Sequence, residues 1–423
     1  MKINEICDSL RVGSDTLALQ TAAQKNTALA AVISSIEQNR AAILAANAED
    51  VAGARAKGMT ESLVERLALD DKKINSIIDS IKIIISQTDP IGEETAGWKT
   101  PNGMTIRQVR VPLGVVAIIY ESRPNVTADA FALAYKSGNA ILLRGSSSAL
   151  KSNKAIVKAI KDGLNSSEAQ GFGVASAIEL APCESHDEVQ EILTAVGKVD
   201  VALPRGGAKL INMVVETAKV PVIQTGAGVC HLYVDESANL SMAEEIAWNA
   251  KTQRPGACNA IECILVNEKV ANDFLPRLAK RFAGKVQLRV DQKSLDILKN
   301  CSLLTAHCSL ASDSDFGFEF LDLICAVKIV RDVNEAISYI NTHNTKHSEC
   351  IVTETRANAR LFQAKIDAAC VYVNSSTRFT DGGEFGFGAE LGISTQKLHA
   401  RGPMGIKALT TTKYLIDGDG QVR

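Results

Sequence analysis

Apolar residues recur at intervals of three and four from the start of the chain to about residue 85, most clearly in the Ala-rich stretch Asn26–Asn47. This spacing places them on one face of a helix, and Gly58 is suited to end such a helix. We therefore expect the first part of the chain to form helices that pack as a layer on a sheet built from later residues.

The pattern changes near Gly97. Two stretches of alternating residues flank Pro101-Asn102-Gly103, which predicts a β-hairpin over Gly97–Leu113. From Gly114, short apolar runs alternate with stretches of helical periodicity. The expected strands are Val115–Tyr120, Ala140–Leu143, Ala175–Leu180, Val199–Leu203 and Val220–Ile223. The expected helices are Ala128–Lys136, one ending at Leu164, His186–Ala195 and one after Arg205-Gly206-Gly207.

The same alternation starts again at Cys230. The expected strands are Cys230–Val234, Ala260–Val266, Leu323–Val330, Glu349–Val352 and Ala369–Asn374, with a final strand-like piece at Ala408–Ile416. The expected helices are Ser241–Ala250, Lys269–Phe282, Glu335–Thr342 and Ala357–Lys365. Strands that alternate with helices indicate parallel sheets covered on both faces, so the expected fold class is α/β with two such domains.

Composition and charge narrow the function classes. Hydrophobic residues make up 46% of the 423 residues, and the formal net charge is -2, which gives no footprint for nucleic acid or an anionic membrane. No apolar run reaches the ~18 residues of a spanning helix, and Met1–Leu10 does not resemble a secretory signal, so we expect a cytoplasmic protein. The 10 cysteines are expected to be thiols, and the spacing of Cys301, His307 and Cys308 fits no zinc template, so no metal site is predicted.

Ligands of parallel sheets bind where the strands end, which directs attention to the loops. The loop that carries Arg254, Pro255, Gly256 and Cys258 lies between an expected helix and strand. A thiol just past a Pro-Gly break and near an arginine can be held partly as the reactive thiolate. The alternative is a cysteine that simply fills space, which is the commoner fate of a thiol.

Four other loops carry candidate binding groups. Asn125 follows the strand ending at Tyr120 and is either a helix-cap or turn residue or an amide donor to an oxyanion. The segments Arg144-Gly145-Ser146 and Arg205-Gly206-Gly207 sit at strand-to-helix turns, where backbone N–H groups favour phosphate, although neither matches a standard dinucleotide or P-loop motif. Arg378 follows the last expected strand of the second domain and is either a partner for an anion or a solvated surface residue.

Together these loops resemble one family. The carrying segments are Tyr120–Thr127, Leu142–Ser146, Leu203–Gly207, Arg254–Ala260, Asp381–Gly388 and Leu398–Gly405. Over essentially the whole chain they look like the γ-glutamyl-phosphate reductases of the aldehyde dehydrogenase superfamily, in the form without a kinase domain. The resemblance implies NADPH-dependent reduction of L-glutamyl 5-phosphate to L-glutamate 5-semialdehyde and phosphate, on the way to proline, through a thioester.

The resemblance also implies roles for individual residues. Cys258 corresponds to the nucleophile and Asn125 to the oxyanion-binding amide. Cofactor contacts fall on Arg144, Gly145, Ser146, Arg205, Gly206, Gly207 and Glu319, the last at the position that holds the nicotinamide ribose; an arginine beside serines suits the 2′-phosphate of NADP. Arg254, Arg378 and His399 are candidates for contact with the substrate's phosphate or carboxylate. Gln224 stands near the place of the general-base glutamate of hydrolytic relatives, and it cannot take a proton from water.

The resemblance further implies an aldehyde-dehydrogenase-like organisation. The expected parts are an NADP-binding domain over residues 1–228, a catalytic domain over 229–384, and a C-terminal segment over 385–423 that returns to the cofactor domain and to a small β oligomerisation arm. A homodimer or tetramer is expected, together with a transient partnership with glutamate 5-kinase. Two alternatives stay open: an acyl-CoA reductase of the same superfamily, and a dinucleotide-binding or scaffold protein without catalysis.

Overall fold

The computed structural model describes residues 2–183, 185, 187–300 and 307–423. The chain forms two compact units. The first contains Met1–Gln224, Gly386–Gly392 and Met404–Arg423, and the second contains Thr225–Phe385 and Ile393–Pro403. The chain thus leaves the first unit after residue 224, and residues 386–403 are shared between the two. This interleaving is finer than the single C-terminal segment over 385–423 suggested by the sequence.

The N-terminal part of the first unit is helical, as the periodicity predicts. Its helices are α1 (Ile3–Leu17), α2 (Ala22–Gln38), α3 (Arg40–Ala56), α4 (Glu61–Leu67) and α5 (Asp71–Ser86). Helix α5 illustrates the cause: Ile74, Ile77, Ile78, Ile81 and Ile84 are all buried on one face. Its start is fixed by the side chain of Asp70, which accepts from the backbone N–H of Lys73 at 2.7 Å.

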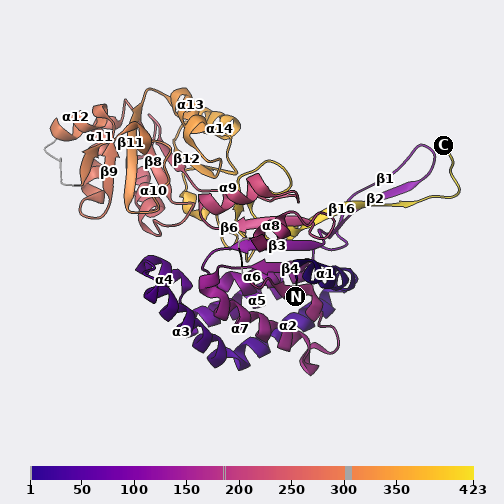
Figure 1. Ribbon diagram of the computed structural model, residues 1–423. Helices are drawn as coiled ribbons and strands as arrows, with labels where there is room; N and C mark the ends of the chain where they lie inside the picture. Colours follow the sequence, from indigo (N-terminus) through magenta and orange to yellow (C-terminus); the bar gives the residue numbers. More distant parts are fainter. Residues whose placement is uncertain (1, 184, 186, 301–306) are drawn as a thin grey trace. The chain divides into compact units, whose positions relative to one another are not determined.

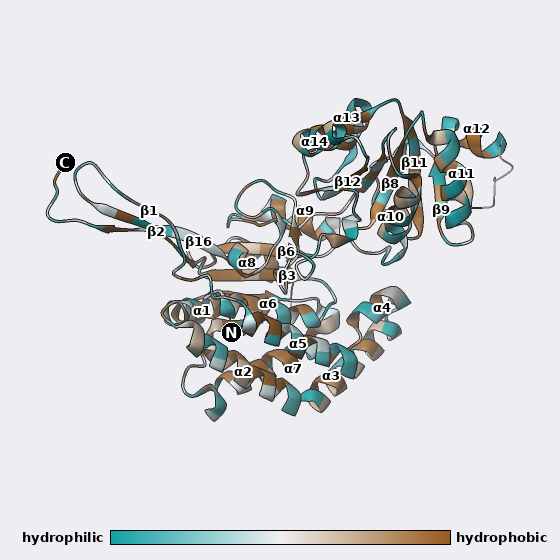
Figure 2. Ribbon diagram, turned by 180° about the vertical axis from the view of Figure 1, so that it is seen from behind, coloured by the Kyte–Doolittle hydropathy of each residue, from teal (hydrophilic) through white to brown (hydrophobic). Residues whose placement is uncertain are grey.

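The sheet of the first unit has four parallel strands in the order β5-β4-β3-β6. They are β3 (Val115–Tyr120), β4 (Ala140–Arg144), β5 (Ile178–Leu180) and β6 (Val201–Arg205). Helices α6 (Asn125–Lys136) and α7 (Leu150–Leu164) lie on one side of this sheet, and α8 (Asp187–Leu193) and α9 (Ala208–Thr217) on the other (Figure 1). All six residues of β3 are buried because both faces are covered, and the strand is correspondingly hydrophobic throughout (Figure 2).

Two expected strands of this unit are wrong in part or in full. Only Ile178–Leu180 of the segment Ala175–Leu180 is a strand, since Ala175–Ala177 forms a 3₁₀ turn. Val220–Ile223 is not a strand; Val222 makes a single bridge with Ala202. Pro221 has no N–H to donate and only accepts, from the N–H of Ala202 at 2.8 Å, so the pairing does not extend. The helix expected at His186–Ala195 is α8, and residue 186 itself lies outside the described residues.

A separate antiparallel sheet confirms the expected hairpin and the expected C-terminal strand. It has the order β1-β2-β16, with β1 at Glu94–Lys99, β2 at Thr105–Pro112 and β16 at Thr410–Asp417. Strand β16 pairs along the whole of β2, from Thr410 opposite Pro112 to Asp417 opposite Thr105. Within the first unit these strands extend away from the four-stranded sheet as an arm (Figures 1 and 2).

The second unit is built on a parallel sheet of seven strands in the order β10-β9-β11-β8-β7-β12-β13. These are β7 (Cys230–Val234), β8 (Ile261–Asn267), β9 (Gln287–Val290), β10 (Cys308–Leu310), β11 (Ile324–Val330), β12 (Ser348–Val352) and β13 (Cys370–Val373). Its helices are α10 (Leu240–Thr252), α11 (Ala271–Phe282), α12 (Gln292–Asn300), α13 (Val333–His343) and α14 (Arg356–Lys365). The short elements β9, α12 and β10 had not been expected.

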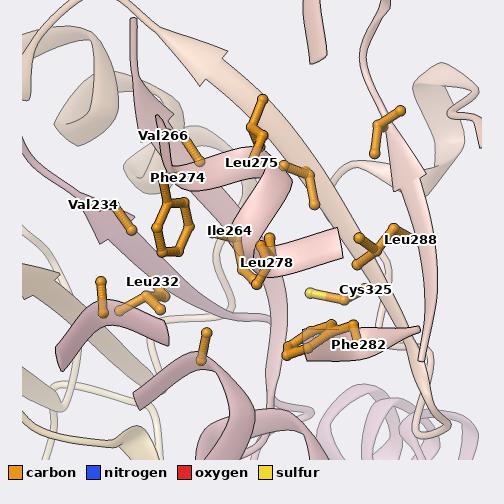
Figure 3. Packing of buried hydrophobic residues seen from close by; sticks show 14 of the residues in the cluster. Leu232, Val234, Ile264, Val266, Phe274, Leu275, Leu278, Phe282, Leu288 and Cys325 are labelled. Carbon is orange, nitrogen blue, oxygen red and sulfur yellow. The ribbon is translucent and has the colours of Figure 1, made fainter. Parts of the chain in front are cut away.

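Successive side chains of the central strands point to opposite faces of the sheet, so they contribute to two hydrophobic cores. Leu232, Ile264 and Val266 pack with residues of α10, α11 and α12, which cover one face of the sheet. Figure 3 shows this core, with Phe274 and Phe282 of α11 over the strands. Tyr233 and Leu265 pack with α13 and α14 on the other face. The expected class, α/β with two parallel-sheet domains and a small β arm, is confirmed.

A two-stranded sheet of β14 (Ile393–Ser394) and β15 (Gly402–Pro403) completes the second unit. Among the described residues, none of the helices combines the length and apolar character needed to cross a membrane. The same residues contain no group of three or more His, Cys, Asp or Glu side chains placed to hold a metal ion. Cys301, which the sequence grouped with His307 and Cys308, lies outside the described residues.

Candidate active site

Three loops of the first unit leave the same edge of its sheet, because β3, β4 and β6 are parallel. Hydroxyl groups from two of these loops meet. The Ser148 Oγ lies 2.7 Å from the Ser122 Oγ and 2.8 Å from the Ser146 Oγ, and Ser146 also accepts from the backbone N–H of Ser148. This cluster of hydroxyls beside Arg144 offers donors to an anionic group at the end of β4.

Arg144 is held by the backbone. Its guanidinium donates to the carbonyls of Gly145 at 3.0 Å and Ser185 at 3.2 Å. Gly145 is a glycine for an internal reason, since a β-carbon there would lie 2.2 Å from the Asn153 amide nitrogen. Gly206 and Gly207 are exposed, and Gly207 is the N-cap of the ten-residue helix α9. Backbone N–H groups at such a helix start suit a phosphate.

Asn125 is the first residue of α6, and the N-cap is Pro124. The cap interpretation of Asn125 is therefore wrong. The Asn125 side-chain amide donates to the Asp129 carboxyl at 3.2 Å, one turn further along the helix. Burial raises the pKa of Asp129. Whether the Asn125 amide also serves an oxyanion stays a prediction.

Cys258 lies in the loop between α10 and β8 in the second unit, with its thiol half-buried. Two tight turns shape this loop: the N–H of Ala257 donates to the Arg254 carbonyl, and the N–H of Ala260 donates to the Ala257 carbonyl. The next residue, Asn259, anchors the loop.

Asn259 ties the Cys258 loop to the segment after β13. Its side-chain amide donates to the Thr380 carbonyl at 2.9 Å. Its backbone carbonyl accepts from the Thr377 hydroxyl at 2.6 Å. Thr377 and Thr380 are themselves buried, so the loop rests on a fixed support.

Gly228 and Glu319 meet beside the nucleophile loop. A β-carbon at Gly228 would fall 1.5 Å from the Cys258 carbonyl oxygen, so only glycine fits there. The Gly228 N–H donates to the Glu319 carboxylate at 2.6 Å. Burial raises the pKa of Glu319, against the lowering effect of this hydrogen bond. The structure thus connects Glu319 to the backbone of Cys258 through one glycine.

Two arginines accompany the thiol. Arg378 is half-buried, and its Nε donates to the Gln253 side chain at 2.8 Å. Burial lowers the pKa of Arg378, and so does the neighbouring positive charge of Arg254; the charge of a Cys258 thiolate acts in the opposite direction. An anion bound here would relieve the repulsion between the guanidinium groups. The hydrogen bond to Gln253 restrains the Arg378 guanidinium, and its role as a partner for an anion stays a prediction.

His399 sits in the loop between β14 and β15, exposed and with a positive φ of 64°. The ion pairs of this loop run to Asp367, which contacts Arg401 at 2.7 Å and Lys397 at 3.2 Å. These contacts give no support to a substrate-binding role of His399, which stays a prediction.

The sequence interpretation missed a buried ion pair next to the nucleophile loop. Lys251 is in the last turn of α10, and Glu262 is the second residue of β8. A carboxylate inside the apolar run Ile261–Val266 is unusual, because buried charges need a partner. That oddity in the strand was the available clue.

Comparisons with known proteins show which family the chain belongs to. The model of the aldehyde dehydrogenase family matches residues 5–296. The chain is 50% identical over 419 residues to the γ-glutamyl phosphate reductase of Alkaliphilus oremlandii, covering 99% of this chain and 98% of that protein. It is 48% identical to the enzyme of that name from Dictyoglomus turgidum, over 98% of this chain and 97% of that protein.

A solved structure extends the likeness to three dimensions. The crystal structure of γ-glutamyl phosphate reductase from Thermotoga maritima matches with a TM-score of 0.95 at 45% identity, over 100% of both chains. The family relationship thus covers both units, including the Cys258 loop. The chain belongs to the aldehyde dehydrogenase family and, within it, to the γ-glutamyl phosphate reductases, oxidoreductases of a family that uses a nicotinamide cofactor.

Proposed function

We propose that this chain reduces L-glutamyl 5-phosphate to L-glutamate 5-semialdehyde and phosphate, with NADPH as the hydride donor and a thioester on Cys258. The observation that carries the proposal is the Cys258 loop. Its thiol is half-buried, its backbone is anchored through Asn259, and Arg378 lies within electrostatic reach. The named relatives, at about half identity over nearly the whole chain, supply the substrate.

In the first half-reaction, the Cys258 thiolate attacks the acyl carbonyl and phosphate leaves with the C–O bonding electrons. The Cys258 N–H and the Asn125 amide are the proposed donors to the tetrahedral oxyanion, each worth about 3 kcal/mol in comparable enzymes. Arg254 and Arg378 are the proposed contacts for the substrate's anionic groups. Phosphate is a good leaving group, so no strong general acid is required.

The residues present fit an anionic dinucleotide. The serine hydroxyls beside Arg144, and the exposed Gly206 and Gly207 at the start of α9, are donors suited to its phosphates. Arg144 would contact the 2′-phosphate that distinguishes NADP from NAD, and Glu319 the nicotinamide ribose. When bound, the cofactor would supply the hydride that converts the thioester to the aldehyde. Gln224 provides no base for hydrolysis, which would preserve the thioester until it is reduced.

The test runs the reaction backwards, because the acyl phosphate is too labile to handle. Purified protein is mixed with pyrroline-5-carboxylate, the cyclised form of the semialdehyde, together with NADP and phosphate, and NADPH absorbance is followed. We expect phosphate-dependent NADPH formation that is lost in Cys258→Ala. Cys308→Ala is the matched control, since Cys308 is also a half-buried thiol but lies on β10.

The outcomes separate the remaining alternatives. Folded wild-type protein that gives no NADPH with phosphate, but does so with coenzyme A and an aldehyde, would be an acyl-CoA reductase. Activity that survives Cys258→Ala would contradict the thioester mechanism. A Cys258 thiol no more reactive toward iodoacetamide than an ordinary exposed thiol would favour a non-catalytic binding protein.

The proposal includes the setting of the enzyme. We propose a cytoplasmic homodimer or tetramer that uses the β1-β2-β16 arm in its assembly. A transient partnership with glutamate 5-kinase would deliver the labile acyl phosphate. The oligomer is testable by light scattering at micromolar concentration, where a monomer would contradict it.

A further inference from the structure

The Lys251–Glu262 ion pair joins the two ends of the nucleophile loop. The Lys251 Nζ lies 2.5 Å from the Glu262 Oε2, and the side chains are 0% and 1% exposed. Lys251 precedes Cys258 on α10, and Glu262 follows it on β8. Removing two charges from water is costly, and apolar residues of similar size often stabilise a fold as well or better. Stability alone is therefore a weak explanation for this pair.

A β-bulge aims the glutamate. In the parallel pairing of β7 with β8, Cys230 lies opposite Ile261, but the next residue, His231, lies opposite Cys263. Glu262 is thus the extra residue on β8. Bulges are rare between parallel strands, and they are over-represented beside active sites, where they redirect a side chain. Here the redirected side chain reaches Lys251.

The second oxygen of Glu262 reaches another part of the site. The Glu262 Oε1 accepts from the backbone N–H of Leu321 at 3.2 Å. Leu321 has a left-handed φ of 54°, a strained conformation for leucine that this bond helps to hold. Leu321 lies two residues after Glu319, so the bond fixes the segment that carries the Glu319 carboxylate.

A continuous series of contacts therefore returns to the nucleophile. Glu262 holds Leu321, the neighbouring Glu319 accepts from the Gly228 N–H, and Gly228 packs on the Cys258 carbonyl. Lys251 compensates the charge of the buried Glu262 carboxylate. The positive charge of Lys251 also acts on Glu319 and favours its ionised form. Each link lies within the second unit.

We propose that Glu262, whose buried charge Lys251 compensates, is a positioning residue that sets the Glu319 carboxylate for the cofactor through the Glu262–Leu321 hydrogen bond. The inference rests on the proposed function, because the cofactor contact of Glu319 is part of that proposal. It adds Glu262 to the residues that shape the reductive site and gives the bulge in β8 a purpose. Neither Glu262 nor Lys251 touches the reacting atoms in this scheme.

The test compares two double variants. Lys251→Met with Glu262→Gln, and Lys251→Met with Glu262→Met, both remove the two buried charges together, which avoids a lone buried charge. Only the first keeps a side-chain oxygen that can accept from Leu321. We measure the dissociation constant of NADPH by its fluorescence, the rate at which iodoacetamide alkylates Cys258 without cofactor, and kcat and KM for the reverse reaction.

We call the variants Met–Met (Lys251→Met with Glu262→Met) and Met–Gln (Lys251→Met with Glu262→Gln). If the variants fold, we expect the Met–Met chain to bind NADPH about tenfold more weakly than wild type, because it loses one buried hydrogen bond. The Met–Gln chain should bind it within about threefold of wild type, which is the rescue that a purely structural role would not give. Cys258 alkylation should be unchanged in both, and the KM for NADP should rise more than kcat falls. The exposed pair Lys269–Glu236, changed to Met and Gln, is the matched control and should alter nothing.

Wild-type NADPH affinity in a folded Met–Met chain would overturn the inference, and equal weakening in both doubles would overturn the route through Leu321. If the Met–Met chain does not fold, Glu262→Asp replaces it, because the shorter carboxylate keeps the charge but cannot reach both partners. It should weaken NADPH binding about tenfold, and unchanged binding would overturn the inference. Failure of the proposed function would instead appear in the wild type, as no turnover of pyrroline-5-carboxylate.

Discussion

The α-carbon of Gly228 packs against the carbonyl oxygen of Cys258 so closely that a methyl group at residue 228 would lie 1.5 Å from that oxygen. Gly228→Ala must therefore displace the nucleophile loop or break the bond between its own N–H and Glu319. A displacement of about 1 Å at a reacting group can cost on the order of a hundredfold in rate. We expect at least that loss in kcat/KM for the reverse reaction, and a changed alkylation rate of Cys258.

Gly53 provides the control for this substitution. It lies within α3, and nothing is found within 4 Å of a β-carbon placed there. Gly53→Ala should leave kcat/KM unchanged and stabilise the helix by up to about 1 kcal/mol. A Gly228→Ala enzyme with normal activity would show that the loop can move without consequence.

The positive charges of Arg254 and Arg378 repel each other, and a bound anion would relieve this repulsion. We therefore predict that an anionic group of the substrate binds at these two residues. We expect Arg378→Met to raise the KM for phosphate in the reverse reaction by about 10- to 100-fold, since a charge-assisted hydrogen bond is worth ~1.5–3 kcal/mol. Arg254→Met should act in the same direction. Arg360→Met, at an exposed position of α14, is the control. An unchanged KM for both phosphate and pyrroline-5-carboxylate would remove the two arginines from the substrate site.

We predict that Arg144 determines the preference for NADPH over NADH. In Arg144→Met, NADPH should bind about 10- to 100-fold more weakly because a charge-assisted contact to the 2′-phosphate is lost, whereas NADH affinity should change little. Fluorescence titration with both cofactors measures the ratio. Lys158→Met, on the exposed side of α7, controls for a general change in charge. Equal loss for NADPH and NADH would assign Arg144 a structural role at the end of β4.

The sequence predicts a strand well where a short apolar run is clearly bounded by polar residues. Val115–Tyr120 and Cys230–Val234 match β3 and β7 residue for residue, because short apolar runs end in polar or acidic residues. The short strand β9 was missed, since its Gln and Arg interrupt the apolar pattern. The strand expected at Val220–Ile223 is reduced to a single bridge, because Pro221 within this apolar run cannot donate a hydrogen bond.

The site is also predictable only in part. Sequence motifs identify Cys258 and the loops of the first unit, but they do not reveal which residues distant in sequence contact each other. No local pattern tells that Gly228 lies on the Cys258 carbonyl, or that a bulge turns Glu262 toward Lys251. Gly145 is a further example: the sequence predicts a phosphate-binding turn there, but does not tell that Asn153 and Tyr120 leave no room for a β-carbon at this position. Tertiary packing explains all three cases.

The arm predicts how copies of the chain assemble. Trp98, Tyr414 and Ile416 expose apolar surface on one face of the β1-β2-β16 sheet, where the Trp98 and Tyr414 rings are 6.1 Å apart. Tyr414→Asp with Ile416→Asp should dissociate the expected oligomer to monomers, as measured by light scattering. Lys413→Asp is the control, since successive residues of a strand point to opposite faces. A wild-type protein that is already monomeric would contradict the expectation.

We predict that the buried His347 makes the protein less stable in acid. The residue is fully buried, its Nδ1 lies 2.8 Å from the Ser348 hydroxyl, and burial lowers the pKa of His347 to about 4. Its ordinary value is 6.5, so between pH 6.5 and 4 the unfolded chain binds a proton that the folded chain does not. Stability from this group is therefore complete above pH 6.5 and is lost as the pH falls, by about 3 kcal/mol at pH 4.

His347→Gln removes the titrating ring and keeps a polar side chain for Ser348. Urea unfolding measured from pH 7 to pH 4 should show a smaller loss of unfolding free energy in the variant than in the wild type, with the difference growing below pH 6.5 and approaching 3 kcal/mol, roughly, at pH 4. Alkylation of Cys258 in the native protein at pH 7 should be equal in the two, which controls for damage to the site. Parallel pH profiles would mean that His347 is protonated within the folded protein, and that its burial is relieved before the protein unfolds.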